Sequence, residues 1–162
     1  MDWVLLILFF LHVAGAVVAF GPTFAFPFIG AAGGKEPVHV NFALRVQNEI
    51  AERLVWPLAL LQGVTGLLLI WKTGINLFAT YWLLVAIVLY LIALANSYFN
   101  LLPTLKKLIA MTSAPPPPPA PGAAPSGPPP ALMALVQRGK QGGMINAVLI
   151  LVIIFLMVTK PF

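Results

Sequence analysis

The chain contains no cysteine and very little charge. Without cysteine it can form no disulfide, no thiolate metal site and no iron–sulfur cluster, and it has no thiol nucleophile. Charged residues make up only 8% of its 162 residues, whereas hydrophobic residues make up 60%. Because a globular domain carries about 25% charged residues, this composition excludes an ordinary water-soluble fold.

Charge is missing altogether from four long stretches, residues 3–34, 54–71, 73–105 and 141–159. A hydrocarbon layer about 30 Å thick is crossed by about 20 helical residues at 1.5 Å each. Each stretch is long enough, or nearly so, to cross it. The sequence therefore predicts an all-α fold, a four-helix transmembrane bundle forming a single membrane domain. The predicted spans are about 3–29, 54–72, 79–102 and 143–159.

The basic residues predict the orientation of this bundle. Seven of the nine lie in the connections after the first and third spans: Lys35, Arg45, Arg53, Lys106, Lys107, Arg138 and Lys140. Positively charged loops stay on the cytoplasmic face, so both termini should lie outside (N-out, C-out). Orientation also explains the net charge of +5 better than nucleic-acid binding does. We therefore expect membrane lipids around the chain, in a cell membrane of the bacterial inner-membrane type.

Residues 38–53 have the pattern of an amphipathic helix. Polar and apolar residues repeat at helical spacing on two faces: Asn41, Arg45, Asn48 and Glu52 on one, Phe42, Val46, Ile50 and Leu54 on the other. Two i,i+4 ion pairs are available along it, Arg45–Glu49 and Glu49–Arg53. The pattern predicts a long cytoplasmic extension on the second helix, beginning at Glu36-Pro37.

Prolines mark the expected interruptions of the helices. Pro22 and Pro27 predict a kink or an early end of the first helix, followed by a flexible turn at 30–34. Pro57 predicts a kink in the second helix, and Pro103 predicts a bend or an end of the third.

A proline-rich linker is predicted at residues 113–130, which hold ten prolines. Such a composition favours extended polyproline II rather than packed structure. The segment could serve as a spacer on the inner surface, which we favour, or as a ligand for a proline-binding module.

Polar side chains inside the predicted spans are the best candidates for function, because they are costly in hydrocarbon unless paired. His12, Gln62 and Tyr90 each lie nine residues inward from an aromatic residue at the outer end of a span. At 1.5 Å per residue, all three are roughly 13–14 Å deep. We predict that they form one midplane cluster and a candidate cofactor-binding site.

Three interpretations of this cluster remain open. The first is that Gln62 and Tyr90 satisfy His12 as hydrogen bonds between helices. The second is that His12 is an axial ligand of a haem iron or of another metal. The third is a proton relay or a bound quinone-like molecule. Because His39 lies roughly 25 Å from His12 by helical rise, a bis-histidine haem within one protomer is not expected.

A second polar layer is expected near the inner surface. It comprises Thr23, Asn96, Ser97, Asn100, Asn146 and the charged residues of segment 38–53, which we interpret mainly as a solvated, salt-paired helix face. The sequence has no Walker loop, nucleophile elbow or HExxH motif, and no paired carboxylates inside the spans. A pump or an ion-coupled transporter is therefore not favoured, and no catalytic residue is assigned.

Residues 11–16 read Leu-His-Val-Ala-Gly-Ala, early in a four-span chain. This pattern resembles a group of bacterial membrane families: predicted integral membrane proteins of unknown function, copper-resistance D-type proteins and haem-dependent protoporphyrinogen oxidases of the HemJ type. The resemblance implies a four-span fold, and by resemblance only His12 would take a haem-ligand role. The oxidases pair that histidine with a lysine in a later span, whereas the third span here has none before Lys106.

Two classes of function follow. The favoured one is a non-catalytic accessory, assembly or scaffold subunit that packs against other membrane subunits or forms a homo-oligomer. The alternative is a small redox protein or oxidase that binds haem b through His12. The sequence names neither a substrate nor a partner.

Overall fold

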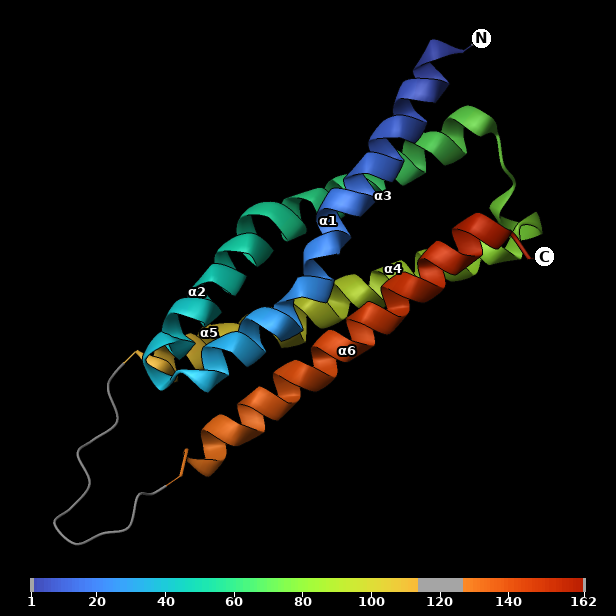
Figure 1. The fold of residues 1–162 in the computed structure, drawn as a ribbon. Coiled ribbons are helices and arrows are strands. Elements are labelled where there is room, and N and C mark those ends of the chain that lie inside the picture. The colour runs from blue at the N-terminus through green and yellow to red at the C-terminus, as the bar shows by residue number, and fades with distance from the viewer. Residues whose placement is uncertain (1, 114–126, 162) are drawn as a thin grey trace, which may run out of the picture.

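The structure is a computed structural model that describes residues 2–113 and 127–161, and all regular structure within them is helical. Four long helices are each long and apolar enough to cross a membrane, which confirms the all-α, four-span prediction (Figure 1). They are α1 (Trp3–Lys35), α2 (Val40–Ile50) continuing into α3 (Trp56–Thr73), α4 (Tyr81–Asn96) continuing into α5 (Leu102–Thr112), and α6 (Pro130–Thr159). Most of the predicted proline-rich linker, residues 114–126, lies outside the described residues.

Helix α1 is longer than the predicted first span, and the flexible turn expected at 30–34 was wrong. The helix runs through Pro22 and Pro27 and ends only at Lys35. The glycines of this segment allow a close helix contact instead of a turn. A Cβ atom added at Gly33 would lie 2.6 Å from the Cβ atom of Ala43 on α2. Glycine therefore lets α2 lie directly against the end of α1 after the short turn Pro37–His39.

The interruptions expected at Pro57 and Pro103 are π-helical turns within continuous helices. These turns, η2 (Ala51–Val55) and η4 (Ser97–Leu101), each end two residues before the proline. In η2 the N–H of Trp56 donates to the carbonyl of Ala51, five residues back. Proline has no N–H, and its ring clashes with the carbonyl four residues before it. One extra residue in the turn changes the local backbone so that the helix can continue.

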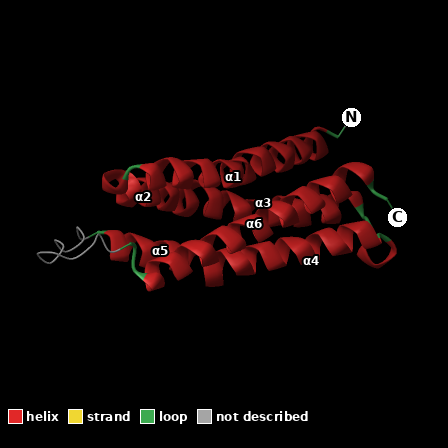
Figure 2. Ribbon diagram, turned by 60° about the horizontal axis from the view of Figure 1, so that its bottom comes forward, coloured by secondary structure: helices red, strands yellow, loops and turns green. Residues whose placement is uncertain are grey.

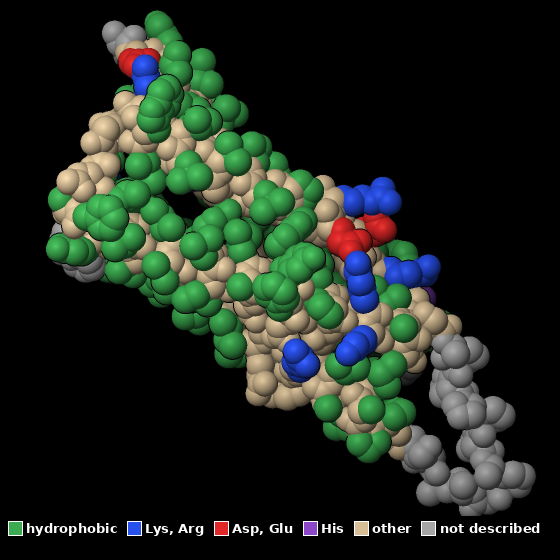
Figure 3. All heavy atoms as spheres, turned by 180° about the vertical axis from the view of Figure 1, so that it is seen from behind, with side chains coloured by type: hydrophobic (Ala, Val, Ile, Leu, Met, Phe, Trp, Pro, Cys, Tyr) green, Lys and Arg blue, Asp and Glu red, His purple; other side chains and the backbone are tan. Residues whose placement is uncertain are grey.

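The helices form two pairs. Helix α1 packs along α3, and α4 packs along α6, while α2 joins the pairs by contacting both α1 and α5. Figures 1 and 2 show α3 and α4 running apart from each other although only a short connection links them. Figure 3 shows an opening between the two helix pairs. The pairs therefore diverge toward the end that holds both termini, and they meet at the other end.

We call that other end the basic end, because it holds seven of the nine Lys and Arg residues: Lys35, Arg45, Arg53, Lys106, Lys107, Arg138 and Lys140. In Figure 3 the Lys and Arg side chains visible there lie together with acidic side chains, next to a surface that is otherwise mostly apolar. At the opposite end one ion pair joins Lys72 to Asp2 at 3.0 Å. On the second pair of helices, the Lys160 Nζ atom lies 5.9 Å from the ring centre of Trp82.

The apolar side chains are distributed as a lipid environment requires. Large hydrophobic residues are exposed along the helices, for example Phe10 at 68% and Trp71 at 79%. Small residues such as Ala19 and Ala86 are buried between them, together with the polar residues Gln62, Thr65, Thr104 and Asn146. Small residues at helix contacts are typical of membrane bundles, in which close packing replaces the hydrophobic effect.

Protonation of Asp2 is predicted to loosen the start of α1. The Lys72 ion pair, with backbone N–H donors of Leu5 and Val4, holds the pKa of Asp2 below its ordinary value of 3.8. A group with a lowered folded pKa contributes fully above its unfolded pKa and loses that contribution as the pH falls through the folded value. Amide exchange at Val4 and Leu5 should therefore quicken, after correction for the intrinsic pH dependence, only below about pH 3.8.

Two variants separate the contributions of Asp2. Asp2→Ala removes the helix cap and the ion pair, and should show fast exchange at neutral pH. Asp2→Asn keeps a capping oxygen and loses only the ion pair, so its exchange should be intermediate. Identical exchange in all three proteins would contradict this account of the helix start.

Candidate functional site

His12 and Gln62 lie together, as the sequence predicts, in the contact between α1 and α3. The Nε2 atom of Gln62 is 3.1 Å from each ring nitrogen of His12. Thr65, which sequence reasoning missed, is the third member: its Oγ1 atom is 2.9 Å from His12 Nδ1. Gln62 and Thr65 are 9% and 5% exposed. Their spacing of three residues places them on one helix face, which was a signal available in the sequence.

Two glycines make room for these side chains. A Cβ atom at Gly66 would lie 3.2 Å from the Cε1 atom of His12, and one at Gly15 would lie 3.0 Å from the Oε1 atom of Gln62. Each helix therefore offers a glycine opposite the polar side chain of the other. The His12 side chain needs this space because a larger neighbour would separate α1 from α3.

One arrangement of hydrogen atoms uses both ring nitrogens of His12. The Thr65 hydroxyl donates to the carbonyl of Leu61 at 3.1 Å, in the same helix. Its oxygen can then accept a hydrogen bond from the Nδ1–H group of His12, and His12 Nε2 can accept one from the Gln62 amide. Within the described residues, the buried Oε1 atom of Gln62 has no hydrogen-bond partner. His12 is thus held from both sides by α3.

Tyr90 contacts the same helix one turn away but does not join the His12 group. Its hydroxyl donates to the backbone carbonyl of Ala59 at 2.7 Å. A Cβ atom at Gly63 would lie 2.7 Å from that hydroxyl, so glycine is needed for the approach. Tyr90 therefore links α4 to α3, across the two helix pairs. The three residues therefore do not form the single predicted cluster: His12 and Gln62 are in contact, and Tyr90 forms a separate bridge.

The second polar layer forms a chain of hydrogen bonds between α4–η4 and α6, which we call the asparagine chain. Arg138 Nε donates to Asn100 Oδ1 at 2.6 Å, and Asn100 Nδ2 donates to Asn96 Oδ1 at 3.0 Å. Asn96 Nδ2 donates to Asn146 Oδ1 at 2.7 Å and to the carbonyl of Gly142 at 2.9 Å. These bonds connect Arg138 to Asn146 through Asn100 and Asn96.

The chain ends on the backbone. Asn146 Nδ2 donates to Ser97 Oγ at 2.7 Å, and the Ser97 hydroxyl donates to the carbonyl of Ala93 at 2.9 Å. Carboxamides do not titrate in the range in which proteins exchange protons, so this chain holds helices together and is not a proton path. It unites four of the residues predicted for this layer, whereas Thr23 forms no side-chain hydrogen bond with it in the described part of the chain.

The polar side of segment 38–53 contacts α5, while its charged side chains remain solvated and salt-paired as predicted, for example Arg53 with 82% of its side chain exposed. Asn41 Nδ2 donates to the carbonyl of Ile109 at the end of α5, at 2.9 Å. Glu52 pairs with Lys106 at 2.7 Å, also on α5. On the apolar face of α2, Phe42 is 61% exposed. The polar face therefore serves as the contact between the two helix pairs.

Of the two ion pairs expected along this segment, one forms. Glu49 pairs with Arg53 at 2.6 Å. Within the described residues, no ion pair joins Arg45 to Glu49.

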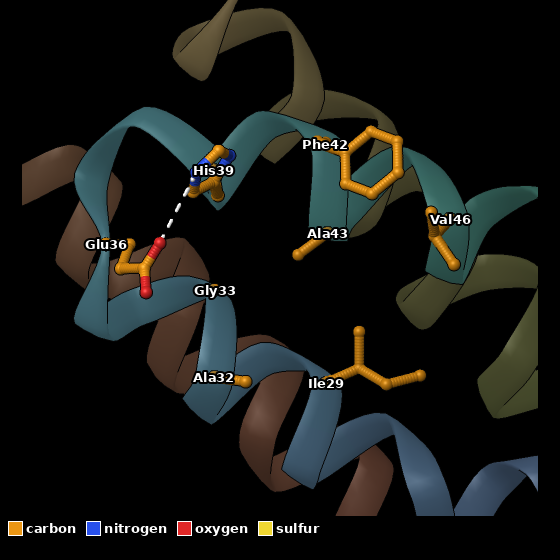
Figure 4. A pocket seen from close by; sticks show the side chains of 8 residues that line it. All are labelled: Ile29, Ala32, Gly33, Glu36, His39, Phe42, Ala43 and Val46. Carbon is orange, nitrogen blue, oxygen red and sulfur yellow. Dashed lines mark ion pairs between the residues drawn. The ribbon is translucent and has the colours of Figure 1, made fainter.

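A surface hollow of about 390 Å³ lies where α1 turns into α2. Figure 4 shows its apolar walls, which include Ile29 from α1 and Phe42 from α2, and the ion pair of Glu36 with His39 at 3.3 Å. Sequence reasoning missed this hollow. Neither it nor the His12 site brings together three or more metal-ligating His, Asp or Glu side chains, within the described residues.

Comparison with known proteins identifies a family. The model of a family described as "predicted integral membrane protein (DUF2269)" matches residues 6–161. No curated protein and no solved structure matches the chain. The family match spans all four long helices and supports the predicted relation to a membrane family.

The asparagine chain is predicted to stabilise the α4–α6 contact through Asn96 and Asn146. Replacing either by alanine should destabilise the bundle, and replacing both should cost less than the sum, because the 2.7 Å bond between them is lost only once. The coupling energy should be about 0.6–1.7 kcal/mol, the range seen for hydrogen bonds between membrane helices. Reversible unfolding in mixed micelles measures it.

Val148→Ala is the matched control for this cycle, since Val148 lies on α6 with 54% of its surface exposed. Its effect should add to that of Asn96→Ala. A coupling energy near zero for the asparagine pair would show that the bond does not stabilise the bundle.

Proposed function

We propose that this chain, which belongs to the family of predicted integral membrane proteins matched above, is a non-catalytic accessory, assembly or scaffold subunit. It would act within a cell membrane of the bacterial inner-membrane type, next to other membrane subunits or a second copy of itself. The observation that carries the proposal is that the polar groups inside the bundle are used to hold its own helices.

His12 is the main example. In the arrangement described above, both of its ring nitrogens are engaged by Gln62 and Thr65 of the neighbouring helix. The asparagine chain uses its amides in the same way. Groups engaged like this stabilise a helix contact, and they are not available to a substrate unless that contact opens. Residues of this kind favour a structural role for the bundle.

The outer surface supports the same proposal. Large apolar residues on every long helix are exposed, among them Phe28 at 76%, Phe99 at 73% and Met144 at 70%. In a membrane these side chains contact lipid tails or the apolar face of a neighbouring subunit. The four long helices therefore offer a large apolar lateral surface for such contacts.

The second candidate is a haem b-binding redox protein that uses His12. A metal-binding histidine usually has its other ring nitrogen hydrogen-bonded to a protein group, and Thr65 lies 2.9 Å from Nδ1 in that way. His12 would then hold the haem iron through Nε2, and haem would supply electron transfer. The Gln62 amide lies 3.1 Å from that nitrogen, so it would have to rotate away. Its buried, unpartnered Oε1 atom, within the described residues, is compatible with such a movement.

The two candidates are separated by absorbance and stability measurements on the protein purified in mild detergent with haem supplied during expression. The scaffold proposal predicts no Soret band. It also predicts that His12→Ala lowers the unfolding free energy by about 1–2 kcal/mol, because helix contacts in membranes lose about 0.6–1.7 kcal/mol for each hydrogen bond removed.

His39→Ala is the matched control, since His39 lies at the surface and forms an ion pair with Glu36 of the neighbouring turn. It should change neither absorbance nor stability appreciably. A Soret band that disappears in His12→Ala and persists in His39→Ala would establish haem binding and reverse the order of the two candidates.

A further inference from the structure

The acidic residues of this chain are few, and each of them forms an ion pair. There are four Asp and Glu residues, and none lies beyond residue 52. Each has a basic partner in the structure: Asp2–Lys72 at 3.0 Å, Glu36–His39 at 3.3 Å, Glu49–Arg53 at 2.6 Å and Glu52–Lys106 at 2.7 Å. The second two-thirds of the chain therefore contains basic residues without any acid of its own.

This leaves uncompensated positive charge at the basic end. Five residues there take part in no ion pair within the described part of the chain: Lys35, Arg45, Lys107, Arg138 and Lys140. The balancing anions must come from the surroundings. Clusters of Lys and Arg next to membrane helices attract anionic lipids, whose headgroups lie at this level.

Arg138 differs from the other four because a hydrogen bond to Asn100 fixes the orientation of its guanidinium group. Its Nε atom donates to Asn100 Oδ1 at 2.6 Å, and Asn100 is in turn held by Asn96. A guanidinium has five N–H donors, and the four on the Nη atoms have no protein partner within the described residues. That planar fork matches two oxygens of one phosphate group.

The depth of Arg138 suits a lipid phosphate. From residue 138 to Lys160 the helix rises about 33 Å at 1.5 Å per residue, close to the roughly 30 Å of the hydrocarbon layer. The two residues thus lie at opposite surfaces of the membrane. Exposed apolar residues lie nearby in sequence on both helices that hold Arg138 and Asn100: Phe99 is 73% exposed and Met144 is 70% exposed. They provide apolar surface for the acyl chains of a lipid whose phosphate is at Arg138.

We propose that Arg138, oriented by the asparagine chain, binds the phosphate of an anionic phospholipid in the leaflet at the basic end. The bound lipid supplies part of the negative charge that the chain lacks. The site is independent of whether the protein is a scaffold or a haem protein, because it involves neither His12 nor its neighbours.

Lipid retention tests the proposal. The full chain is purified in mild detergent, exchanged into mixed micelles with equal phosphatidylglycerol and phosphatidylcholine, and examined by native mass spectrometry. The unmodified protein should retain phosphatidylglycerol at least about fivefold better than phosphatidylcholine, because the positioned guanidinium forms charge-assisted hydrogen bonds to a phosphate whose negative charge no choline group neutralises. Arg138→Gln should reduce the preference to near one, and Arg138→Lys should restore only part of it.

Two further variants separate positioning from charge. Asn100→Leu keeps every charge and removes the acceptor of Arg138 Nε, so it should lower the preference by at least about half. Lys140→Gln removes one charge from the same helix without touching the asparagine chain, and should change the preference by less than twofold. Thermal unfolding in detergent identifies any variant that fails to fold, and Arg138→Gln, at an exposed residue, should fold normally.

Several results would overturn the proposal. Equal retention of the two lipids by the unmodified protein would show no selectivity. Equal losses in Arg138→Gln and Lys140→Gln would show diffuse attraction in place of a site. An unchanged preference in Asn100→Leu would remove the role of the asparagine chain. Displacement of phosphatidylglycerol by millimolar inorganic phosphate would assign the guanidinium to a soluble anion.

Discussion

Hydrocarbon offers no hydrogen-bond partners, so a polar group inside the bundle is costly unless the protein itself satisfies it. Most of the internal organisation follows from this constraint. His12 is paired across α1 and α3, and the asparagine chain runs between α4 and α6. Each helix pair thus has its own polar contact, and α2 and Tyr90 connect the pairs. Apolar packing alone would leave the partners of each helix poorly specified, because lipid tails are as apolar as the side chains.

Glycine decides where these polar contacts can form. Gly66 and Gly15 face His12 and Gln62, and Gly63 lies under Tyr90. Gly142 offers both its carbonyl to Asn96 and space to Asn100, whose Nδ2 atom would lie 2.7 Å from an added Cβ atom. A hydrogen bond between two transmembrane helices requires a short distance between their backbones. The glycines supply that distance, and the polar side chains then determine which helices meet.

The sequence predicted the features that depend on composition and period, namely the four helices, the paired depth of His12 and Gln62, and a polar layer around Asn96 and Asn146. It did not predict correctly the features that depend on which face of one helix contacts a neighbouring helix. The composition of segment 30–34 predicts a turn, whereas Gly33 in fact permits a helix contact with Ala43. Tyr90 contacts α3 within one turn of Gln62, but it bonds to a backbone carbonyl, which no side-chain pattern reveals. Thr65 could have been predicted as a member of the His12 site, because its spacing of three residues from Gln62 places both on one helix face.

The two π-helical turns have a geometric consequence for everything beyond them. Each residue of an α-helix advances its neighbours by about 100°, so the additional residue in η2 rotates α2 relative to α3 by about that angle. In the observed phase, α3 presents Gln62 to α1 while α2 presents Asn41 to α5. Shortening η2 by one residue would keep both helices intact and yet point α2 at the wrong neighbour. The proline two residues later makes that shortening sterically unfavourable. Pro57 therefore fixes the rotation of α2 relative to α3 about the helix axis.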